Sequence, residues 1–384
     1  MRNRANARLV GWTILAGVVA FSFSAWPCSI PVFRWALERW EPDNYRLAVF
    51  YRGAIEPAQG EILEAIEARA ADAEHPVNLQ VIRIDLDGEM DDASAALWKE
   101  HADATLPWAV LHYPAGTHIA AAVWAGNLGD VNVEALVDSP ARQQIVKDLV
   151  AGVSAVWVLV ESGDPSKDLA AATRLNQQLE QAKNALKLPD ITDDPVLDGP
   201  NAPDVSDLRV DFSMHRIKRD DPAERFLTAM LTKSESDLES LAAEPMAFPV
   251  FGRGRALYAF VGKGINSDTI GRACAFLIGG CSCELKAENP GTDLLLACDW
   301  EGKLGSMELI HEIELPPLPG VATPSIEETP GQEAPSEPLG DSASEPDGRN
   351  GVSTLARHAI LAVVAVGALV LIATAVIFKR TALK

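Results

Sequence analysis

Apolar and polar residues recur along residues 43–315 in a pattern that predicts two successive mixed α/β regions. Short apolar runs mark the strands, and apolar residues at every third or fourth position mark the helices. In the first region the expected order is strand, helix, strand, helix, strand, strand, helix. These elements are expected over residues 46–51, 60–71, 77–86, 93–101, 108–112, 119–124 and 132–137. A helix with an apolar stripe is expected before them, from Ser29 to Trp40.

The second region is predicted to repeat this order. Strands and helices alternate over residues 155–160, 166–186, 208–217 and 222–231. Phe248-Pro249 then precedes a short strand, a glycine-rich turn follows, and a further strand is expected over residues 256–261. A closing helix capped by Asn266 or Ser267 is expected to run to Ile278. Because both regions end on the same succession of elements, the chain is predicted to contain a tandem duplication.

The N-terminal end has the pattern of an export signal. Three arginines precede an apolar run over residues 9–21, and small residues follow it at Ser22, Ser24 and Ala25. The sequence therefore predicts a signal peptide over residues 1–25. Two alternatives stay open, an uncleaved anchor and a lipid on Cys28.

The C-terminal end predicts a membrane helix. Residues 359–378 are uncharged and apolar over about 20 positions, the length that spans a bilayer. Lys379, Arg380 and Lys384 follow, and the positive-inside rule assigns this short tail to the cytoplasm. Residues 316–356 before the helix are rich in Pro, Glu, Ser and Gly, which predicts a disordered stalk.

Net charge narrows the range of partners. The formal charge is −21 and the sequence pI is about 4.7. A net negative charge of this size repels nucleic acid, so DNA or RNA binding is disfavoured. With 48% hydrophobic residues the chain has enough apolar surface to form a sizeable core.

Two short motifs in the first region carry a resemblance to a known fold. Residues 81–87 read VIRIDLD, and Leu106-Pro107 stands directly before the run Trp108-Ala109-Val110-Leu111. Together with the element order over residues 43–150, these motifs resemble the thioredoxin fold. The resemblance implies that Pro107 is a structural cis-proline beside the site where that family has its redox centre. The stretches 28–40 and 248–265 also resemble bacterial envelope proteins, a likeness that implies no activity.

The first region departs from the thioredoxin family in its chemistry. The family has a Cys-x-x-Cys motif where the helix after the first strand begins, because a helix N-terminus lowers the pKa of a thiol there. Aligned on Pro57, this chain has Ile55 and Ala58 at the two cysteine positions. Without a thiolate there is no disulfide exchange, so we expect no catalytic activity in the first region.

Four of the five cysteines cluster in the second region, at Cys274, Cys281, Cys283 and Cys298. A turn at residues 288–291 predicts a hairpin with Cys281 opposite Cys298, and Cys274 lies on the apolar face of the preceding helix. The four sulfur atoms are therefore expected on one buried face. Ring strain disfavours a bond between Cys281 and Cys283. Of the two pairings that remain, the hairpin register favours Cys281 with Cys298 and Cys274 with Cys283.

Three interpretations of this cluster compete. Two structural disulfides suit an oxidising compartment and are favoured. A four-thiolate zinc site fits the expected geometry, but the spacing lacks paired Cys-x-x-Cys motifs. A redox-active Cys281-Ser282-Cys283 would be strained and easily reduced, which suits an isomerase.

Other motifs offer weaker candidates. Gly252-Arg253-Gly254-Arg255 either binds an anion or forms a tight hairpin turn, which needs no ligand. The acidic residues at 85–92 lack the glycine and terminal glutamate of a good calcium loop, so a solvated loop is favoured. The histidines have no metal-ligand spacing, and no phosphate-binding or nucleophile-elbow motif is present.

The sequence thus predicts an α/β protein of two tandem thioredoxin-like domains, a disordered stalk and one C-terminal transmembrane helix. The expected boundaries are 26–150 for the first domain with its N-terminal helix, 151–315 for the second, and 357–384 for the membrane helix and tail. The expected function is a non-catalytic, membrane-anchored binding or assembly module on the extracytoplasmic side, without cofactor or metal. Its expected partners are the membrane and another envelope protein. The alternative is a thiol-disulfide oxidoreductase or isomerase that uses Cys281 and Cys283.

Overall fold

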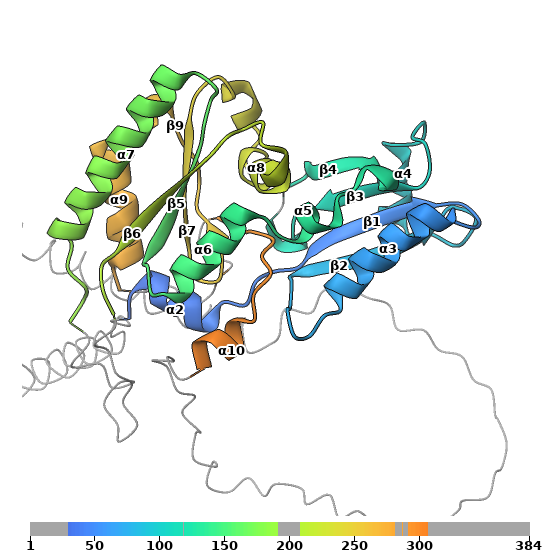
Figure 1. Ribbon diagram of the computed structural model, residues 1–384, viewed down its shortest axis with the longest axis horizontal. Coiled ribbons are helices and arrows are strands. Elements are labelled where there is room, and N and C mark those ends of the chain that lie inside the picture. Colours follow the sequence, from blue (N-terminus) through green and yellow to red (C-terminus); the bar gives the residue numbers. More distant parts are fainter. Residues whose placement is uncertain (1–29, 118, 191–207, 281–285, 287–290, 306–384) are drawn as a thin grey trace, which may run out of the picture. The chain divides into compact units, whose positions relative to one another are not determined.

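The computed structural model describes residues 30–117, 119–190, 208–280, 286 and 291–305. Within them the chain has a mixed α/β fold with two sheets (Figure 1). No helix in these ranges is both long enough and apolar enough to cross a bilayer. The expected signal peptide, stalk and membrane helix lie outside the described residues.

The first sheet has four strands in the order β2-β1-β3-β4. Strands β1 and β2 are parallel, whereas β3 is antiparallel to both β1 and β4. Their bounds are Tyr45–Tyr51 for β1, Leu79–Asp85 for β2, Trp108–His112 for β3 and Ala122–Asn127 for β4. The alternation in the sequence predicted the first three within about two residues and β4 about three residues too early.

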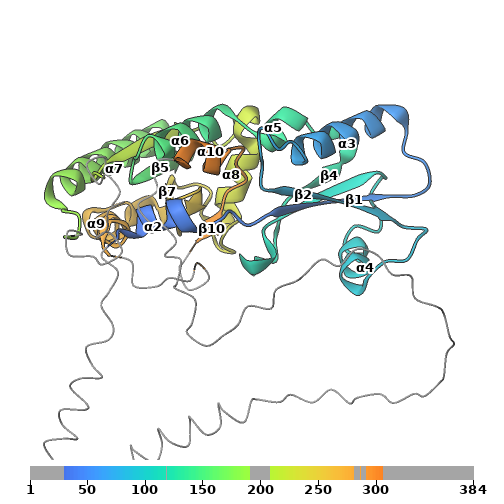
Figure 2. The same cartoon turned by 90° about the horizontal axis from the view of Figure 1, so that it is seen from below.

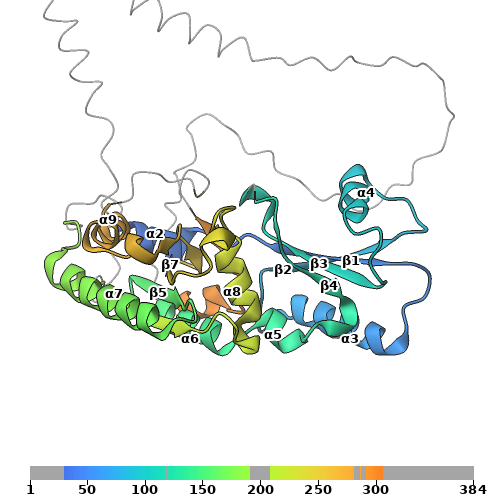
Figure 3. The same ribbon diagram turned by 90° about the horizontal axis from the view of Figure 1, so that it is seen from above.

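The faces of the first sheet are covered unequally. Helices α3 (Pro57–Ala70) and α5 (Val133–Val137) lie on one face, and α4 (Asp92–Lys99) is the only described helix on the other (Figures 2 and 3). Helix α6 (Pro140–Val150) follows α5 and packs against the second sheet. Helix α4 has no buried residue, although its Trp98 ring packs against Phe50 with the ring centroids 5.2 Å apart. Helix α6 was not expected, because the closing helix was predicted to end near residue 137.

The second sheet has six strands, and its main path runs in the order β10-β8-β7-β5-β6, with β9 also paired to β7. Strands β5 and β6 are parallel, and β7 is antiparallel to β5, β8 and β9. The bounds are Ala155–Val160 for β5, Phe212–Ile217 for β6, Met246–Phe251 for β7, Arg255–Ala256 for β8, Phe260–Val261 for β9 and Thr292–Asp293 for β10.

Strand β5 is buried on both faces. Val156, Val158 and Val160 belong to the core shared with the first sheet, whereas Trp157 and Leu159 belong to a second core. The second core packs under α7 (Pro165–Ala185) and α9 (Ser267–Ile278), and the shared core under α6 and α8 (Arg225–Thr232). Asn266 caps α9 in a capping box with Thr269, which confirms the predicted helix start.

The N-terminal helix packs against the second sheet, not the first. In α2 (Val32–Arg39), Val32, Phe33 and Ala36 lie in the second core, and the Val32 N–H donates to Gly279 O at 3.0 Å. The sequence assigned this helix to the first domain, because local patterns carry no information about a partner more than 200 residues away.

The C-terminal part of the second region returns to the first sheet. Cys298 N–H donates to Pro76 O at 2.9 Å, and the Asn78 side chain bonds to the backbone of Leu294 and Leu296. The fully buried Arg142 of α6 donates to Leu295 O at 3.3 Å, and burial lowers its pKa to about 10. These crossing segments join the two sheets through a common core.

Two expected details of the second sheet are wrong. Pro249 lies inside β7 opposite Trp157, whereas Pro107 precedes β3, so the repeat is not exact at the prolines. The predicted strand over residues 256–261 is two separate two-residue strands, β8 and β9. Leu257 and Tyr258 lie between them, where the chain leaves the sheet.

Candidate functional site

A cavity of about 370 Å³ lies at the edge of the first sheet where the parallel strands β1 and β2 end. We call it the Pro107 cavity. The turn after β1, the start of α3, the residues before β3 and the end of β4 all contribute to it. Its lining residues are Tyr51, Arg52, Ala54, Ile55, Glu56, Gln59, Thr105, Leu106, Pro107 and Asn127.

Asn127 holds one wall of the Pro107 cavity. Its Nδ2 donates to Thr105 O at 3.1 Å, and its Oδ1 accepts from Gly129 N–H at 2.9 Å. Leu128 N–H donates to Pro107 O at 2.9 Å. The Leu106–Pro107 peptide bond is cis, the isomer that the sequence resemblance implied. Backbone and side-chain bonds therefore fix this wall in place.

The opposite wall is the start of α3, and it has few internal hydrogen bonds. Glu56 at the N-cap makes no side-chain capping bond, and Pro57 occupies the first turn. Gly53 adopts a left-handed φ of 63° in the turn before it. No hydrogen bond from the amides of residues 53–56 to another described residue was found. The amides of Gln59 and Gly60 both donate to Glu56 O, so the backbone donors open to water or a ligand belong to the exposed turn at residues 53–56.

The Pro107 cavity has no residue for thiol chemistry. Ile55 packs partly into the core, and Ala58 is exposed on the first turn of α3. Arg52 pairs with Asp87 at 3.1 Å on an exposed surface, where the pair contributes little to stability. The lining of this cavity therefore provides polar groups and backbone donors but no thiol.

The equivalent turn of the second sheet is closed by a carboxylate. Asp168, which is 3% exposed, accepts hydrogen bonds from Ser162 N–H, Ser162 Oγ and Gly163 N–H at 2.7–3.1 Å. Asp164 caps α7 by accepting from the amides of Ser166 and Lys167. The donors of this turn and helix are therefore satisfied internally.

Charges around the second turn also pair with one another. Arg216 lies 2.6 Å from Glu161, and Lys167 lies 2.6 Å from Glu244. Arg219 donates to Glu161 O at 3.3 Å, and burial lowers its pKa. This surface has no surplus of positive charge that would favour an anion.

The described cysteines do not share one buried face. Cys274 belongs to the second core under α9, whereas Cys298 belongs to the core shared with the first sheet, on the other side of β5. Both are free thiols in the structure, and burial raises the pKa of each to about 12, so neither is a ready nucleophile. The prediction that the four sulfur atoms lie on one buried face is therefore wrong for Cys274 and Cys298. Cys298 follows β10, and the pairing of β10 with β8 was not predicted from the sequence.

The other two cysteines, Cys281 and Cys283, lie outside the described residues. The predicted bonds of Cys281 with Cys298 and of Cys274 with Cys283 each include one of them. The placement of Cys274 and Cys298 on opposite faces of the sheet is incompatible with a bond between those two. A bond between Cys281 and Cys283 would leave Cys274 to pair with Cys298. The structure therefore disfavours this pairing, as ring strain does.

The two arginines of the 252–255 turn are not available to an anion. Arg253 is buried, donates to the backbone oxygens of Leu37 and Glu38, and pairs with Glu301 at 2.6 Å. Arg255 pairs with Asp293. Gly252 and Gly254 have φ of 57° and 96°, and a side chain on Gly252 would collide with Ala36 of α2. The motif is a hairpin turn that clamps α2, the interpretation that needs no ligand.

No metal centre occurs among the residues that the structure describes, because no three His, Cys, Asp or Glu side chains converge there. In the acidic 85–92 loop, Asp91 caps α4 by accepting from Ser94 N–H, and Asp85 accepts from Asp87 N–H. The loop uses its carboxylates to satisfy its own backbone, as a solvated loop does.

Sequence reasoning identified Pro107 but missed Asn127, Gln59 and Asp168. For Asn127 a signal existed, since Asn-Leu-Gly has the form of an Asx turn. For Asp168 the only signal was its place on the first turn of a helix, where carboxylates usually face solvent. Comparison of the chain with known protein families and with curated proteins finds no match to either.

Proposed function

We propose that this chain is a membrane-tethered, extracytoplasmic binding module that holds a segment of another envelope protein in the Pro107 cavity, without thiol chemistry. In this proposal the two sheets belong to tandem thioredoxin-like domains. A flexible stalk and a C-terminal transmembrane helix attach them to the membrane.

The strand order supports the tandem assignment. In both sheets a parallel β-α-β pair is followed by antiparallel strands, which gives the orders β2-β1-β3-β4 and β6-β5-β7-β8. This is the arrangement expected of a thioredoxin-like domain. The tether is supported by the apolar runs at residues 9–21 and 359–378.

The observation that carries the proposal is the open cavity where the family has its redox centre. The cavity keeps a fixed wall at Asn127 and Pro107, and it faces the uncapped start of α3. Ile55 and Ala58 replace the two cysteines. Unsatisfied backbone donors in a concave site bind polar backbone or side-chain acceptors of a ligand, so the site is suited to a peptide segment.

Photo-crosslinking in intact cells tests the proposal. The full chain carries p-benzoylphenylalanine either at Ala54, in the cavity, or at Glu180, on the exposed outer face of α7. We expect one discrete protein adduct from Ala54 and none from Glu180. The adduct should survive replacement of all five cysteines by serine, because no thiol takes part. Adducts of equal yield from both positions, or loss of the adduct on removal of the cysteines, would overturn the proposal.

Topology is tested separately. Alkaline phosphatase fused after Leu315 should be active and fused after Lys384 inactive, since the enzyme folds only outside the cytoplasm. The reverse pattern contradicts the proposed orientation and leaves the cavity assignment to the crosslinking result.

A further inference from the structure

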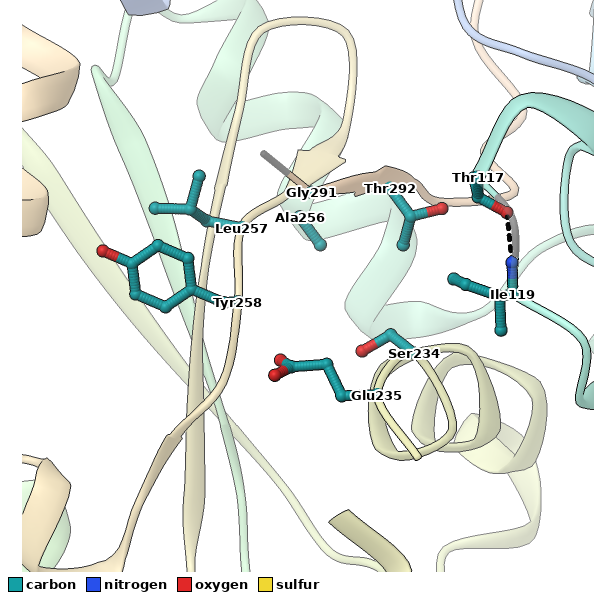
Figure 4. Close-up of a pocket in the computed structure, with 9 residues that line it drawn as sticks. All are labelled: Thr117, Ile119, Ser234, Glu235, Ala256, Leu257, Tyr258, Gly291 and Thr292. Atoms are coloured by element: carbon teal, nitrogen blue, oxygen red, sulfur yellow. Dashed lines mark hydrogen bonds between the residues drawn. The ribbon is translucent and has the colours of Figure 1, made fainter. Parts of the chain in front are cut away.

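A second cavity, of about 200 Å³, lies where the β3–β4 connection approaches the second sheet (Figure 4). We call it the Tyr258 cavity. Thr117 and Ile119 come from the β3–β4 connection, and Ser234 and Glu235 follow α8. Ala256–Tyr258 run from β8 into the segment before β9, and Gly291–Thr292 lead into β10. Both halves of the protein contribute to it, and it shares no residue with the Pro107 cavity.

Tyr258 is unusual in its exposure. It is one of four large hydrophobic residues, among those described, with more than a third of their surface exposed, and its value is 45%. Its ring lies 5.1 Å from that of Phe260, which holds one side of it. An aromatic ring kept exposed at the rim of a cavity offers its π-face to a ligand.

Glu235 is fixed in position on the other side of the cavity. Its Oε1 accepts a hydrogen bond from Ala259 N–H at 2.8 Å, directly after Tyr258. In Figure 4 its carboxylate is directed to the side of the cavity where Tyr258 lies. Among the residues that the structure describes, Glu235 forms no ion pair, and no Lys or Arg lines the cavity. A carboxylate held by the backbone beside an aromatic ring is left without a cation.

Part of the remaining lining suits an aliphatic chain, whereas Ser234 and Thr292 add hydroxyl groups. Ile119, Ala256 and Leu257 are apolar, and the hydroxyl of Thr117 is already used, since it donates to Pro114 O at 2.8 Å. A lysine-like ligand buries its methylene groups along such a surface and keeps its charged end at the polar side. The volume of about 200 Å³ is that of one side chain, not of a larger cofactor.

We propose that the Tyr258 cavity binds an alkylammonium group, with Glu235 as its counter-ion, Tyr258 as its π-face and the Ile119–Leu257 surface against its methylene groups. The net charge of −21 favours the approach of such a cation. The same chemistry is found in a lysine side chain of a partner and in a free polyamine.

Fluorescence anisotropy of dansylcadaverine on the full-length chain in detergent tests this proposal. We expect saturable binding that n-pentylamine displaces and that n-pentanol and pentanoate do not. Glu235→Gln keeps the acceptor for Ala259 N–H and should weaken binding by at least about 10-fold, whereas Tyr258→Ala should weaken it about 5-fold. The matched control is Glu239→Gln, which removes an equal charge from an exposed site outside the cavity and should change affinity less than about 2-fold.

Two further competitors separate the sources of the cation. Stronger competition by a blocked lysine tripeptide assigns the site to a protein partner, and stronger competition by spermidine assigns it to a free polyamine. The proposal is overturned by absence of binding at millimolar amine, by equal displacement with n-pentanol, or by an unchanged affinity of a folded Glu235→Gln variant. Thermal unfolding of each variant establishes that it is folded.

Discussion

The two sheets share a strand order but differ at the turn that follows their first strand. After β1, the amides of residues 53–56 have no described hydrogen-bond acceptor and α3 lacks a side-chain cap. After β5, the buried Asp168 accepts three hydrogen bonds from the turn and Asp164 caps α7. The backbone donors of the first turn are thus open to water or a ligand at the Pro107 cavity. Those of the second turn are bonded to carboxylates of the same protein.

This difference assigns separate roles to the two halves. A turn whose donors are satisfied internally adds stability, whereas donors left free at a cavity cost stability unless water or a ligand binds them. Packing agrees with this contrast, because α7 and α9 cover one face of the second sheet and α6 and α8 the other, whereas α4 is the only described helix on one face of the first sheet. In the proposed function, the first half therefore presents the Pro107 cavity and the second half supports it.

The largest expected effect comes from removing the carboxylate that closes the second turn. Asp168→Ala leaves three donors without an acceptor in a buried site and should lower the free energy of unfolding by about 3 kcal/mol. Glu56→Ala in the first turn should change it by less than about 0.5 kcal/mol, because Glu56 makes no capping bond. Urea unfolding followed by circular dichroism measures both.

Asp168→Asn is the matched control. It keeps an acceptor oxygen at the same place and should recover part of the loss. Equal destabilisation by Asp168→Ala and Glu56→Ala would remove the distinction between a closed and an open turn.

Helix caps give the next largest effect, with opposite signs in the two halves. Asp164→Ala removes the acceptor for the amides of Ser166 and Lys167 and should cost about 1 kcal/mol. Glu56→Asp introduces the short carboxylate that α3 lacks and should stabilise the chain by about 0.5 kcal/mol. The same unfolding experiment measures both changes, and destabilisation by Glu56→Asp would show that the α3 start already has a partner.

The smallest effect concerns pH. His112 of β3 lies opposite Arg46, the second residue of β1. At the corresponding position of the second sheet, Val250 lies opposite Val156. Burial lowers the pKa of His112, and the charges of Arg46 and His101 lower it further, against a smaller opposite effect of Glu100.

Since the folded state binds this proton less readily than the unfolded chain, His112 stabilises the fold above its ordinary pKa of about 6.5. That contribution is lost as pH falls below this value. Thermal unfolding at pH 7 and pH 5 should therefore show a larger loss in the wild type than in His112→Gln. An equal loss in both chains would mean that His112 keeps its ordinary affinity for protons.

The sequence was informative wherever structure is local. Alternation located β1, β2 and β3, the Asn266 cap located α9, and the missing Cys-x-x-Cys was evident before the fold was known. It failed where partners are distant. Nothing near α2 indicates that it packs on the second sheet, and nothing near Cys298 indicates that β10 pairs with β8.

The candidate site followed the same division. Pro107 could be identified from its neighbours, since it directly precedes a strand of the expected order. The role of Asp168 could not be identified in this way. A carboxylate in the first turn of a helix is expected to face solvent, and only the structure shows that the turn at Ser162 and Gly163 donates to it. Tyr258 and Glu235 come together only through the bonded backbone of Ala259, a contact across 24 positions.

Hydrogen–deuterium exchange of the full-length chain tests the contrast between the two turns most directly. Mass spectrometry of peptides that cover residues 51–60 and 160–168 reports the amides of both turns in one sample. We expect rapid exchange at residues 53–56 and slow exchange at Ser162 and Gly163, which becomes rapid in Asp168→Ala. Equal protection of the two turns in the wild-type chain would contradict it.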